Sequence, residues 1–415
     1  LNIINKSVKQ NHLWKMALVV DNKHRLIGAV TDGDVRRGLI NGVTVNDRVS
    51  KIMVNDPIFV ESNLSKNEML LLMKKKIRNT ARLKEDSVEF IIIVDDDHKP
   101  IDLVSFHDIS NEQLITEKPV CIIGVGQVGL TLLVVIAETG FKALGYDINQ
   151  TKIKKLCEGK VDFFELGVES LLKIHLKNEN LKFVNKLKND KSQIYIICVG
   201  TPVDESTNRP IIDDIKSASE IVSKSLNKND LIILRSTVTV GTTRNTVIPI
   251  IEKNSGLKAG KDFSITFSPE RVVEGNAIEE IKKIPQIIGG IDSNSVRQAT
   301  RFFQKIGSPI IAVESLEAAE IVKLINNTFR DYCFGFSNNL VSLCDKLGLN
   351  TNNIISAASD GYPRNQLPKP SPGVGGYCLT KDPYLLAHVA EENDLASEIY
   401  TVGRRANQNV LNFVF

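Results

Sequence analysis

The sequence lacks the features that mark membrane, secreted and nucleic-acid-binding proteins. It has no run of about 18 apolar residues that could span a bilayer, and residues 1–16 lack the apolar core of a secretory signal. Its 52 Lys and Arg nearly balance its 49 Asp and Glu, and no block of five like charges occurs. We therefore expect a soluble protein that binds neither a membrane nor nucleic acid.

Cysteine is scarce, and its six positions do not have the paired spacing of a metal site or a disulfide framework. Unpaired cysteines are typical of the reducing cytoplasm, so we predict a cytoplasmic protein without a metal centre. The 26 glycines, 14 prolines and 42% hydrophobic content are typical of a globular protein. Because a domain has about 100–200 residues, the length predicts two to four domains.

An internal repeat occupies the first quarter of the chain. Residues 17–35 align with residues 91–109 at an offset of 74 without a gap, and six of the nineteen pairs are identical. Each copy predicts two strands joined by an Asp-led turn, then a hydroxyl and an Asp three residues later. A hydroxyl can donate to a phosphate and an Asp can accept from a ribose, which suggests a nucleotide site; the alternative is that these residues cap helices. The candidate residues are Thr31, Asp34, Ser105 and Asp108.

The repeat, and the stretch VTDGDVRRGL within it, resemble a tandem cystathionine-β-synthase-type (CBS) module, a pair of βαββα units. The resemblance implies a regulatory module over residues 1–116, with an adenine nucleotide as its candidate ligand. The first copy is expected to be incomplete, because most of the strand and helix that should precede Ala17 are missing from the sequence.

Residues 119–150 predict a strand, a glycine turn, a helix and a second strand. In the G-x-G-x-x-G turn, Gly124 permits the tight bend, Gly126 lets the backbone approach a pyrophosphate, and Gly129 lets the helix pack on the strand. Asp147 follows eighteen residues later, where a carboxylate would accept from ribose hydroxyls and repel the 2′-phosphate of NADP. The unit therefore predicts NAD binding; a packing turn without a ligand is the alternative.

More cofactor contacts are expected around this turn and beyond the next strands. The apolar runs IYIICVGTP and LIILRSTV predict buried parallel strands that end in hydroxyl residues. Ligands of such sheets bind beyond the carboxyl ends of the strands, although these hydroxyls could instead cap the following helices. The additional candidates are Val125, Gln127, Val128, Lys152, Thr201, Ser236, Thr237, Glu274 and Lys381.

The stretch PSPGVGGYCLTKDPY, residues 370–384, places one cysteine in a setting that suits chemistry. Gly375 and Gly376 leave the backbone bare beside Cys378, which lets a substrate approach, and Lys381 is expected to favour the thiolate. Cys378 is therefore a candidate nucleophile. The usual role of cysteine is structural and buried, and that role is expected for Cys121, Cys198, Cys333 and Cys344.

A helix is predicted from about Ala318 to Leu349, long enough to bridge two domains. Lys323 and Asn327 lie four residues apart, hence on one face, where a cation and an amide could together hold an oxyanion. The alternative is a solvated helix surface or a hydrogen bond between helices. Glu270 is a further candidate, in the turn-rich stretch FSPERVVEGNAI after a strand.

Six motifs, taken together and in this order, resemble the UDP-glucose/GDP-mannose dehydrogenase family, and most closely its UDP-N-acetylhexosamine branch: GVGQVG, VGTP, STVTVGTT, SPERVVEGNA, AAEIVKLINNTFRD and PGVGGYCLTKD. The resemblance covers residues 119–407. It implies a four-electron oxidation at carbon 6 of a UDP-N-acetylhexosamine, of the ManNAc or GlcNAc type, to the uronic acid. Two NAD would be reduced per sugar, through a thiohemiacetal and a thioester on Cys378.

The resemblance also implies roles for the other candidates. Lys323 and Asn327 would stabilise oxyanions, Asp382 and Glu270 would assist proton transfer, and Thr201 would position a water. Arg271 replaces an aromatic residue of glucose-type members, which favours N-acetylated sugars. The residues implied to bind the substrate are Glu270, Arg271, Glu274, Lys323, Asn327, Arg364, Gly375 and Gly376.

The predicted architecture is α/β. The CBS pair (1–116) precedes a doubly wound Rossmann-type parallel sheet (117–313) and a long helix with a helical central domain that forms a homodimer (314–408). Residues 409–415 would only begin the family's C-terminal UDP-binding domain, so poor turnover is expected from this chain. Two alternatives stay open: a two-electron hydroxyacid dehydrogenase that would not need Cys378, and an inactive dehydrogenase that serves as scaffold for a nucleotide sensor.

Overall fold

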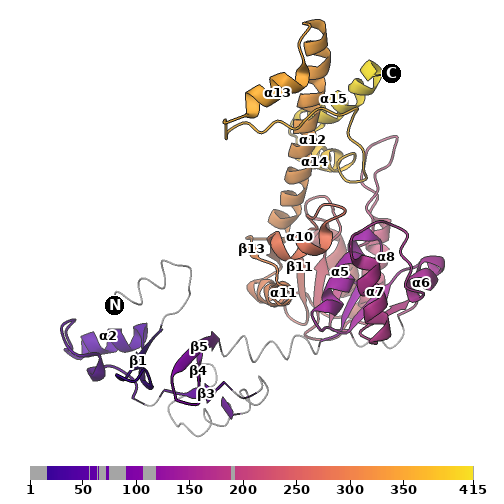
Figure 1. Cartoon of the computed structure of the whole chain (residues 1–415). Coiled ribbons are helices and arrows are strands. Elements are labelled where there is room, and N and C mark those ends of the chain that lie inside the picture. Colours follow the sequence, from indigo (N-terminus) through magenta and orange to yellow (C-terminus); the bar gives the residue numbers. More distant parts are fainter. Residues whose placement is uncertain are drawn as a thin grey trace. The chain divides into compact units, whose positions relative to one another are not determined.

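The computed structural model divides the chain into two compact units, residues 1–115 and 116–415 (Figure 1). The residues that it describes are 16–55, 57–62, 64, 72–73, 90–105, 118–187 and 192–414.

The backbone of the N-terminal unit repeats as the sequence does. β1 (Met16–Val20) pairs antiparallel with β2 (Leu26–Thr31), and β4 (Phe90–Val94) pairs antiparallel with β5 (Pro100–Ser105). The two registers are related by the same 74-residue offset, and both ladders shift at the last residue of the first strand. β3 (Phe59–Glu61) adds a parallel strand to β4.

The two hairpin turns also have the same chemistry. Asp21 accepts hydrogen bonds from two backbone N–H groups of its own turn, and Asp95 does the same in the second copy. His24 and His98, at equivalent positions, have left-handed φ angles of 61° and 62°, a conformation that residues other than glycine seldom adopt. The predicted repeat is therefore confirmed down to its turns.

Thr31 and Asp34 cap a helix, as the alternative interpretation expected, while their role as nucleotide ligands stays a prediction. α2 (Asp32–Ile40) starts with a capping box, in which the Thr31 hydroxyl accepts from the N–H of Asp34 and the Asp34 carboxylate accepts from the N–H of Thr31. The carboxylate also forms an ion pair with Arg37 at 2.5 Å, so both of its oxygens accept hydrogen bonds within the protein. In the second copy, Ser105 ends β5 but its side chain is not among those described, and Asp108 lies outside the described residues.

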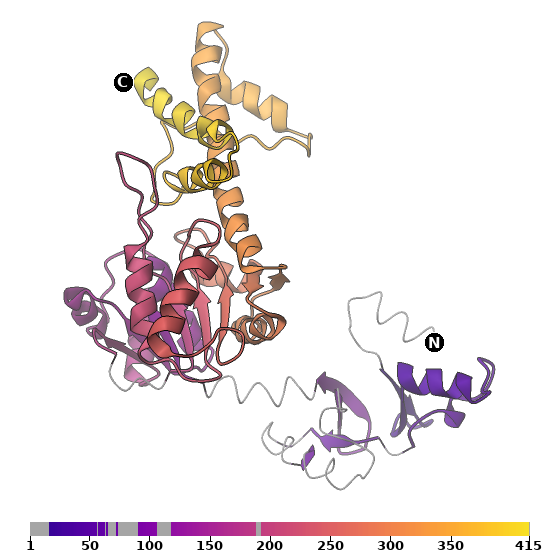
Figure 2. The same cartoon turned by 180° about the vertical axis from the view of Figure 1, so that it is seen from behind.

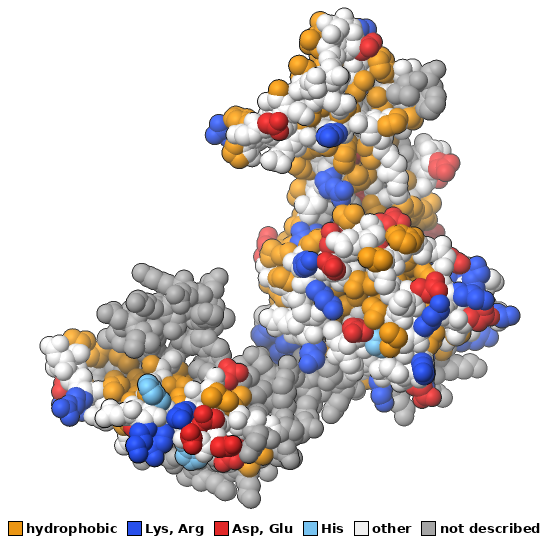
Figure 3. All heavy atoms as spheres, in the orientation of Figure 1, with side chains coloured by type: hydrophobic (Ala, Val, Ile, Leu, Met, Phe, Trp, Pro, Cys, Tyr) orange, Lys and Arg blue, Asp and Glu red, His pale blue; other side chains and the backbone are white. Residues whose placement is uncertain are grey.

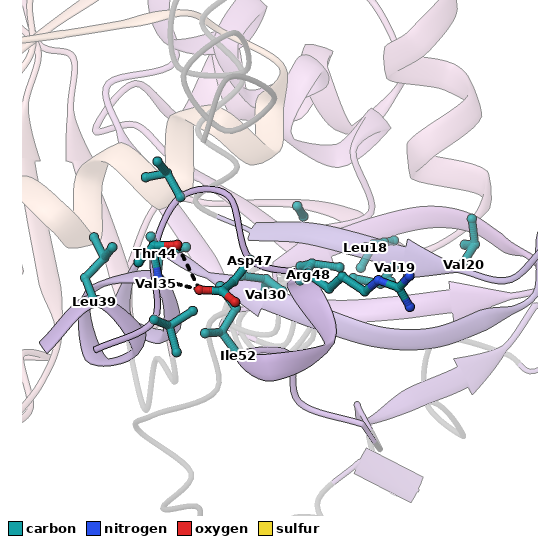
Figure 4. Close-up of a pocket in the computed structure, with 14 residues that line it drawn as sticks. Leu18, Val19, Val20, Val30, Val35, Leu39, Thr44, Asp47, Arg48 and Ile52 are labelled. Carbon is teal, nitrogen blue, oxygen red and sulfur yellow. Dashed lines mark hydrogen bonds between the residues drawn. The ribbon is translucent and has the colours of Figure 1, made fainter. Parts of the chain in front are cut away.

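A cavity of about 430 Å³ lies beside β1 and α2 (Figure 4). Its lining is mainly aliphatic, and its polar side includes Arg48 and the Asp47 carboxylate, which accepts from the N–H and the hydroxyl of Thr44 at 2.8 Å. Thr31 and Asp34 are not among the residues that line it. The two candidate nucleotide-binding residues therefore lie outside the lining of this cavity.

An eight-stranded sheet forms the core of the second unit, in the order β13-β12-β11-β10-β9-β6-β7-β8. The six strands β6 to β11 are parallel, whereas β12 runs antiparallel to β11, and β13 is parallel to β12. The predicted wholly parallel sheet is corrected at this edge, because the chain between β11 and β12 returns at the same end of the sheet instead of crossing over. The strands are β6 (Val120–Ile123), β7 (Ala143–Tyr146), β8 (Leu181–Val184), β9 (Ile194–Ile197), β10 (Leu231–Leu234), β11 (Ser264–Phe267), β12 (Gln286–Gly290) and β13 (Ile310–Ala312).

Helices cover both faces of this sheet, as expected for strands that are apolar throughout. α5 and α7 lie on the face seen in Figure 1, and α8 and α9 on the face seen in Figure 2. The central strands β6, β9 and β10 are buried along their whole length. The helices of this domain are α5 (Gln127–Glu138), α6 (Gln150–Cys157), α7 (Val168–Lys177), α8 (Asp213–Ser223), α9 (Ile248–Ser255), α10 (Ala277–Lys283) and α11 (Ser293–Ile306), and a π-helical turn, Thr243–Val247, precedes α9.

A 31-residue helix, α12 (Leu316–Lys346), leads from the sheet to a group of helices above it (Figure 1). Its first turn is capped by Ser315, whose hydroxyl accepts from the N–H of Ala318. α12 crosses α15 at two glycines, where a Cβ on Gly335 would lie 2.6 Å from the backbone of Gly403. The other helices are α13 (Thr351–Ser359), α14 (Asp382–Glu391) and α15 (Glu398–Val414). No helix within the described ranges is both long and apolar enough to cross a membrane.

Buried polar groups tie the loop before α14 to the long helix. Asp331 on α12 forms an ion pair with Arg404 of α15 and accepts from the amide of Asn407. Asn338, about two turns further along α12, donates to Asn407 and accepts from the N–H of Ser371 at 2.7 Å. The chain that carries Cys378 is therefore anchored on α12.

Candidate active site

The glycine turn after β6 has the geometry that its sequence predicts. Gly124 has a φ of 92°, which favours glycine. A Cβ on Gly129 would lie 1.9 Å from the carbonyl oxygen of Gly124, so only glycine lets α5 approach so closely. A Cβ on Gly126 would meet no atom within 4 Å, which leaves space beside the backbone for a ligand. The predicted structural roles of Gly124 and Gly129 are confirmed, and the role of Gly126 beside a pyrophosphate stays a prediction.

A crevice of about 290 Å³ lies beside this turn, at the carboxyl ends of β6, β7 and β9. The strand order reverses between β6 and β9, which is where open α/β sheets bind their ligands. Among the predicted cofactor residues, those that line it are Gly124, Gly126, Asp147 and Lys152. Gln127 and Val128 form the first turn of α5 beside it.

Asp147 is well placed for a ribose, but it already has a partner. Its carboxylate accepts from the N–H groups of Val125 and Asn149, and from the ammonium of Lys152 at 2.9 Å. Lys152 is thus positioned on Asp147, at the end of the crevice where a ribose diol would bind. The crevice, with its bare glycine turn and its carboxylate, fits the adenosine half of NAD.

The hydroxyls beyond β9 and β10 hold the two strand ends together. Ser236 donates to the carbonyl of Val199 at 2.7 Å, and Thr201 donates to the carbonyl of Thr237 at 2.5 Å. Neither hydroxyl caps a helix, so that alternative is wrong for both. As their protons are committed, they could only accept hydrogen bonds from a ligand here. The Thr237 side chain is half-buried beside them.

Residues from distant parts of the chain meet around Cys378. The carboxylate of Asp382 accepts from the Asn327 amide at 2.6 Å and from the Lys381 ammonium at 2.7 Å. Lys381 also lies 3.4 Å from the Thr201 hydroxyl. These four side chains are buried, whereas Cys378 is exposed to solvent. The predicted residues therefore form one polar cluster with a thiol at its surface.

Lys381 lowers the pKa of Cys378 and so favours its thiolate, as expected, but the net pKa of this thiol is raised. Desolvation by the surrounding protein raises the pKa of this thiol, and the nearby Asp382 carboxylate raises it further. Lys323 and Lys381 lower the pKa but do not outweigh these effects, because the Lys381 charge is already paired with Asp382. Cys378 is therefore a thiol in this structure, and its proton must leave when the sulfur attacks.

Lys323 is buried in the same cluster. Its ammonium donates to the backbone carbonyl of Glu270 at 2.5 Å, and burial lowers its pKa. A lowered pKa makes the neutral form of an amine easier to reach, and the neutral form can accept a proton. Lys323 is thus placed to accept a proton and, once charged, to stabilise an anion.

Glu270 lies beside Lys323 but its carboxylate has a structural partner. The Arg235 guanidinium donates to it at 2.6 and 2.9 Å, and the N–H groups of Arg271 and Val272 donate to it as well. Burial alone would raise the pKa of Glu270, but Arg235 and these hydrogen bonds outweigh it and lower the pKa. The carboxylate therefore stays charged, which argues against its expected role in proton transfer.

The sequence motifs did not point to Arg235, although its guanidinium fixes the Glu270 carboxylate beside the site. It is 1% exposed and also donates to the carbonyl of Ser268 and to the side chain of Gln286. The signal for it was present, because a charged residue ends the apolar run LIILR and so had to be buried with a partner. Arg235 positions Glu270 through its carboxylate, and the backbone carbonyl of Glu270 in turn accepts from the ammonium of Lys323.

Three other predicted residues lie outside the buried cluster. Arg271 is turned toward β12 and donates to the carbonyl of Pro285. Arg364 is exposed and stacks on the ring of Tyr362, 4.6 Å from its centroid. Glu274 is exposed to solvent. The structure does not bring them together with Cys378, so their binding roles stay predictions.

Gly375 and Gly376 leave the approach to the thiol open. A Cβ on either would meet no atom within 4 Å, and Gly376 has a φ of 83°. The backbone beside Cys378 is thus bare, as the sequence predicts.

Comparison with known proteins gives matches for the domain built on the eight-stranded sheet and for the helices that follow it. Residues 118–307 match the NAD binding domain of the UDP-glucose/GDP-mannose dehydrogenase family, and residues 317–409 match its central domain. The UDP-N-acetyl-D-mannosamine dehydrogenase of Campylobacter jejuni is 33% identical over 301 residues, 71% of this chain and 72% of that protein. The UDP-N-acetyl-D-glucosamine 6-dehydrogenase of Salmonella typhi is 32% identical over 302 residues, 72% of this chain and 69% of that protein.

Solved structures agree with the sequence relatives. The structure of the UDP-D-ManNAc dehydrogenase from Pyrococcus horikoshii is similar with a TM-score of 0.67 and 30% identity, over 71% of this chain and 69% of that one.

Proposed function

Because the chain belongs to the UDP-glucose/GDP-mannose dehydrogenase family, we propose that it oxidises carbon 6 of a UDP-N-acetylhexosamine, of the ManNAc or GlcNAc type, to the uronic acid. The predictions of an oxidoreductase and of an NAD-binding domain are confirmed by this membership. The observation that carries the proposal is the thiol of Cys378 beside the buried residues Lys323, Asn327 and Asp382.

The chemistry suits two successive oxidations on one site. When bound, NAD accepts the hydride in each oxidation step. Lys323 takes the hydroxyl proton as the alcohol becomes an aldehyde, and the Cys378 sulfur then attacks the aldehyde carbon to form a thiohemiacetal. The thiol proton passes to the oxygen of the thiohemiacetal. Lys323, after it has released the first proton to solvent, takes the proton of this hydroxyl as the second hydride leaves to a second NAD, which gives a thioester. Water then adds its hydroxyl to the acyl carbon and its proton to the sulfur, so that the carbon–sulfur bond breaks and the acid is released.

Lys323 and Asn327 have donors to spare for the oxyanions in these steps. An ammonium has three N–H donors and an amide has two, and the structure uses one of each, for the Glu270 carbonyl and for Asp382. The remaining donors can bind a negatively charged oxygen formed beside Cys378. Asp382 orients Asn327 and is a candidate to accept a proton from water.

The number of NADH formed per sugar tests the proposal. We expect two NADH for each UDP-ManNAc or UDP-GlcNAc consumed, measured by absorbance and by mass spectrometry of the product. The full chain is used at a concentration equal to that of the sugar, so that the count does not depend on turnover. One NADH with a two-electron product would indicate a hydroxyacid-type dehydrogenase, and NAD binding without NADH would indicate an inactive scaffold. UDP-glucose is the comparison sugar.

We further propose that two copies of the chain form a homodimer through α12 and α15. In support, a row of large apolar side chains is exposed on α12 at helical spacing, and hydrophobic side chains are visible over this part of the surface (Figure 3). A soluble monomer seldom exposes so many apolar groups together. The row consists of Ile325, Phe329, Tyr332, Phe336, Leu343 and Leu347.

Phe329→Asp is expected to convert the dimer to a monomer, because it places a charge within the apolar row, at its most exposed side chain, which is 65% exposed in the single chain. Sedimentation velocity would measure the halved mass. Phe164→Asp, at an even more exposed phenylalanine of the NAD-binding domain, is the matched control and should leave the mass unchanged. A monomeric unmodified chain would contradict the proposal.

For the N-terminal unit we propose a tandem module of the CBS type. The support is the repeated hairpin, with the same register shift and the same turn in both copies. An adenine nucleotide stays its candidate ligand, on the side chains of Thr31 and Asp34, which also form the helix cap.

A further inference from the structure

Tyr377, the residue before the candidate nucleophile, lies against the wall of the cofactor crevice. Its hydroxyl is 3.6 Å from the position that a Cβ on Gly200 would occupy. Gly200 lines the crevice together with Asp214. The tyrosine therefore brings the Cys378 loop to the end of β9, although the two segments are far apart in the sequence.

The surroundings of Tyr377 leave its ring available to a ligand. The side chain is 58% exposed, so it is not needed to fill the core. The Lys381 ammonium lies 5.4 Å from its ring centroid. Burial of the hydroxyl, and the nearby Cys378, Asp382 and Asp214, raise its pKa, so the phenol keeps its proton and remains a hydrogen-bond donor.

We infer that Tyr377 contacts the dinucleotide at the Gly200 end of the crevice and thereby positions the Cys378 loop over the bound cofactor. A dinucleotide that starts at Asp147 and follows the crevice past the glycine turn reaches Gly200. An aromatic ring at that point adds a flat apolar surface and one donor. Because coupling between two sites is reciprocal, bound NAD must in turn restrain the loop. The loop part of this inference rests on the proposed function, whereas the NAD contact does not.

Titration of the full chain with NAD, without sugar, tests the contact. Tyr377→Ala is expected to raise the Kd for NAD about three- to tenfold, the range of a lost aromatic contact, and Tyr377→Phe should stay within about twofold because it keeps the ring. The matched control is Tyr362→Ala, an exposed tyrosine of the same loop whose ring stacks on Arg364 and is not among the residues that line the crevice. The control should bind NAD as the unmodified chain does.

The rate at which iodoacetamide alkylates Cys378 measures how accessible the Cys378 loop is. Bound NAD should change this rate in the unmodified chain and in Tyr377→Phe, and the change should shrink at least about twofold in Tyr377→Ala at saturating NAD. An unchanged Kd in Tyr377→Ala, an equal rise in Tyr362→Ala, or an undiminished effect of NAD on alkylation would overturn the inference. None of these results depends on sugar oxidation, so the inference can fail while two NADH per sugar are still formed.

Discussion

Cys378→Ser is expected to lower the yield of uronic acid by at least about a thousandfold, because an unactivated hydroxyl is a much weaker nucleophile than a thiolate and does not form the covalent adduct with the aldehyde that the second oxidation needs. NAD affinity should be unchanged, since Cys378 is not among the residues that line the cofactor crevice. Mass spectrometry of the sugar, with the enzyme at substrate concentration, would show the starting alcohol or an aldehyde in place of the acid.

Cys157→Ser is the matched control, because Cys157 is also an exposed cysteine but ends α6, in the NAD-binding domain. It should form acid as the unmodified chain does. The surroundings raise the pKa of Cys378 above the ordinary 9.0, so acid formation in the unmodified chain should also accelerate from pH 7 to pH 9 as more thiolate forms. Undiminished acid from Cys378→Ser would sink the thioester mechanism and favour a two-electron enzyme.

Arg235→Met is expected to have the largest effect on stability, about 3–5 kcal/mol, because it leaves the Glu270 carboxylate buried without its partner. For a unit of this size we expect the unfolding midpoint to fall by roughly 5–15 °C, measured by calorimetry on the full chain. The folded-state pKa of Glu270 is below its usual 4.5. The stabilisation is therefore complete above pH 4.5 and is lost as the pH falls through the folded-state pKa.

Two variants separate the buried charge from other effects at this position. Arg235→Met/Glu270→Gln removes both charges and should recover most of the lost midpoint. Arg244→Met breaks an exposed ion pair with Glu317 and should cost less than about 1 kcal/mol. A double variant as unstable as Arg235→Met would show that the arginine acts through its packing on Phe303 and not through Glu270.

Much of the site could be predicted because its determinants are local. The φ of Gly124 and the close approach at Gly129 follow from a spacing of a few residues, and so does the shared helix face of Lys323 and Asn327, which both point into the buried cluster. The sequence offered less guidance where a partner comes from a distant part of the chain. The proton-transfer role expected of Glu270 did not account for Arg235, 35 residues earlier in the chain.

The antiparallel edge of the sheet shows the same limit. The apolar strand that becomes β12 looks like its neighbours in the sequence, and only the path of the chain after β11 decides that it runs the other way. Thr31 and Asp34 show this limit on a smaller scale, because only the structure shows that the helix begins there and that these two residues cap it.

By itself, the sequence determined the repeat, the glycine turn, the long helix and the family, because each depends on the order and spacing of residues along the chain. Only the tertiary structure decided which charges are free and which are paired: Lys381 on Asp382, Lys152 on Asp147 and Arg235 on Glu270. The reason is physical. The protonation state and donor capacity of a side chain depend on its burial and on the charges within a few ångströms, and folding brings those charges together from distant positions.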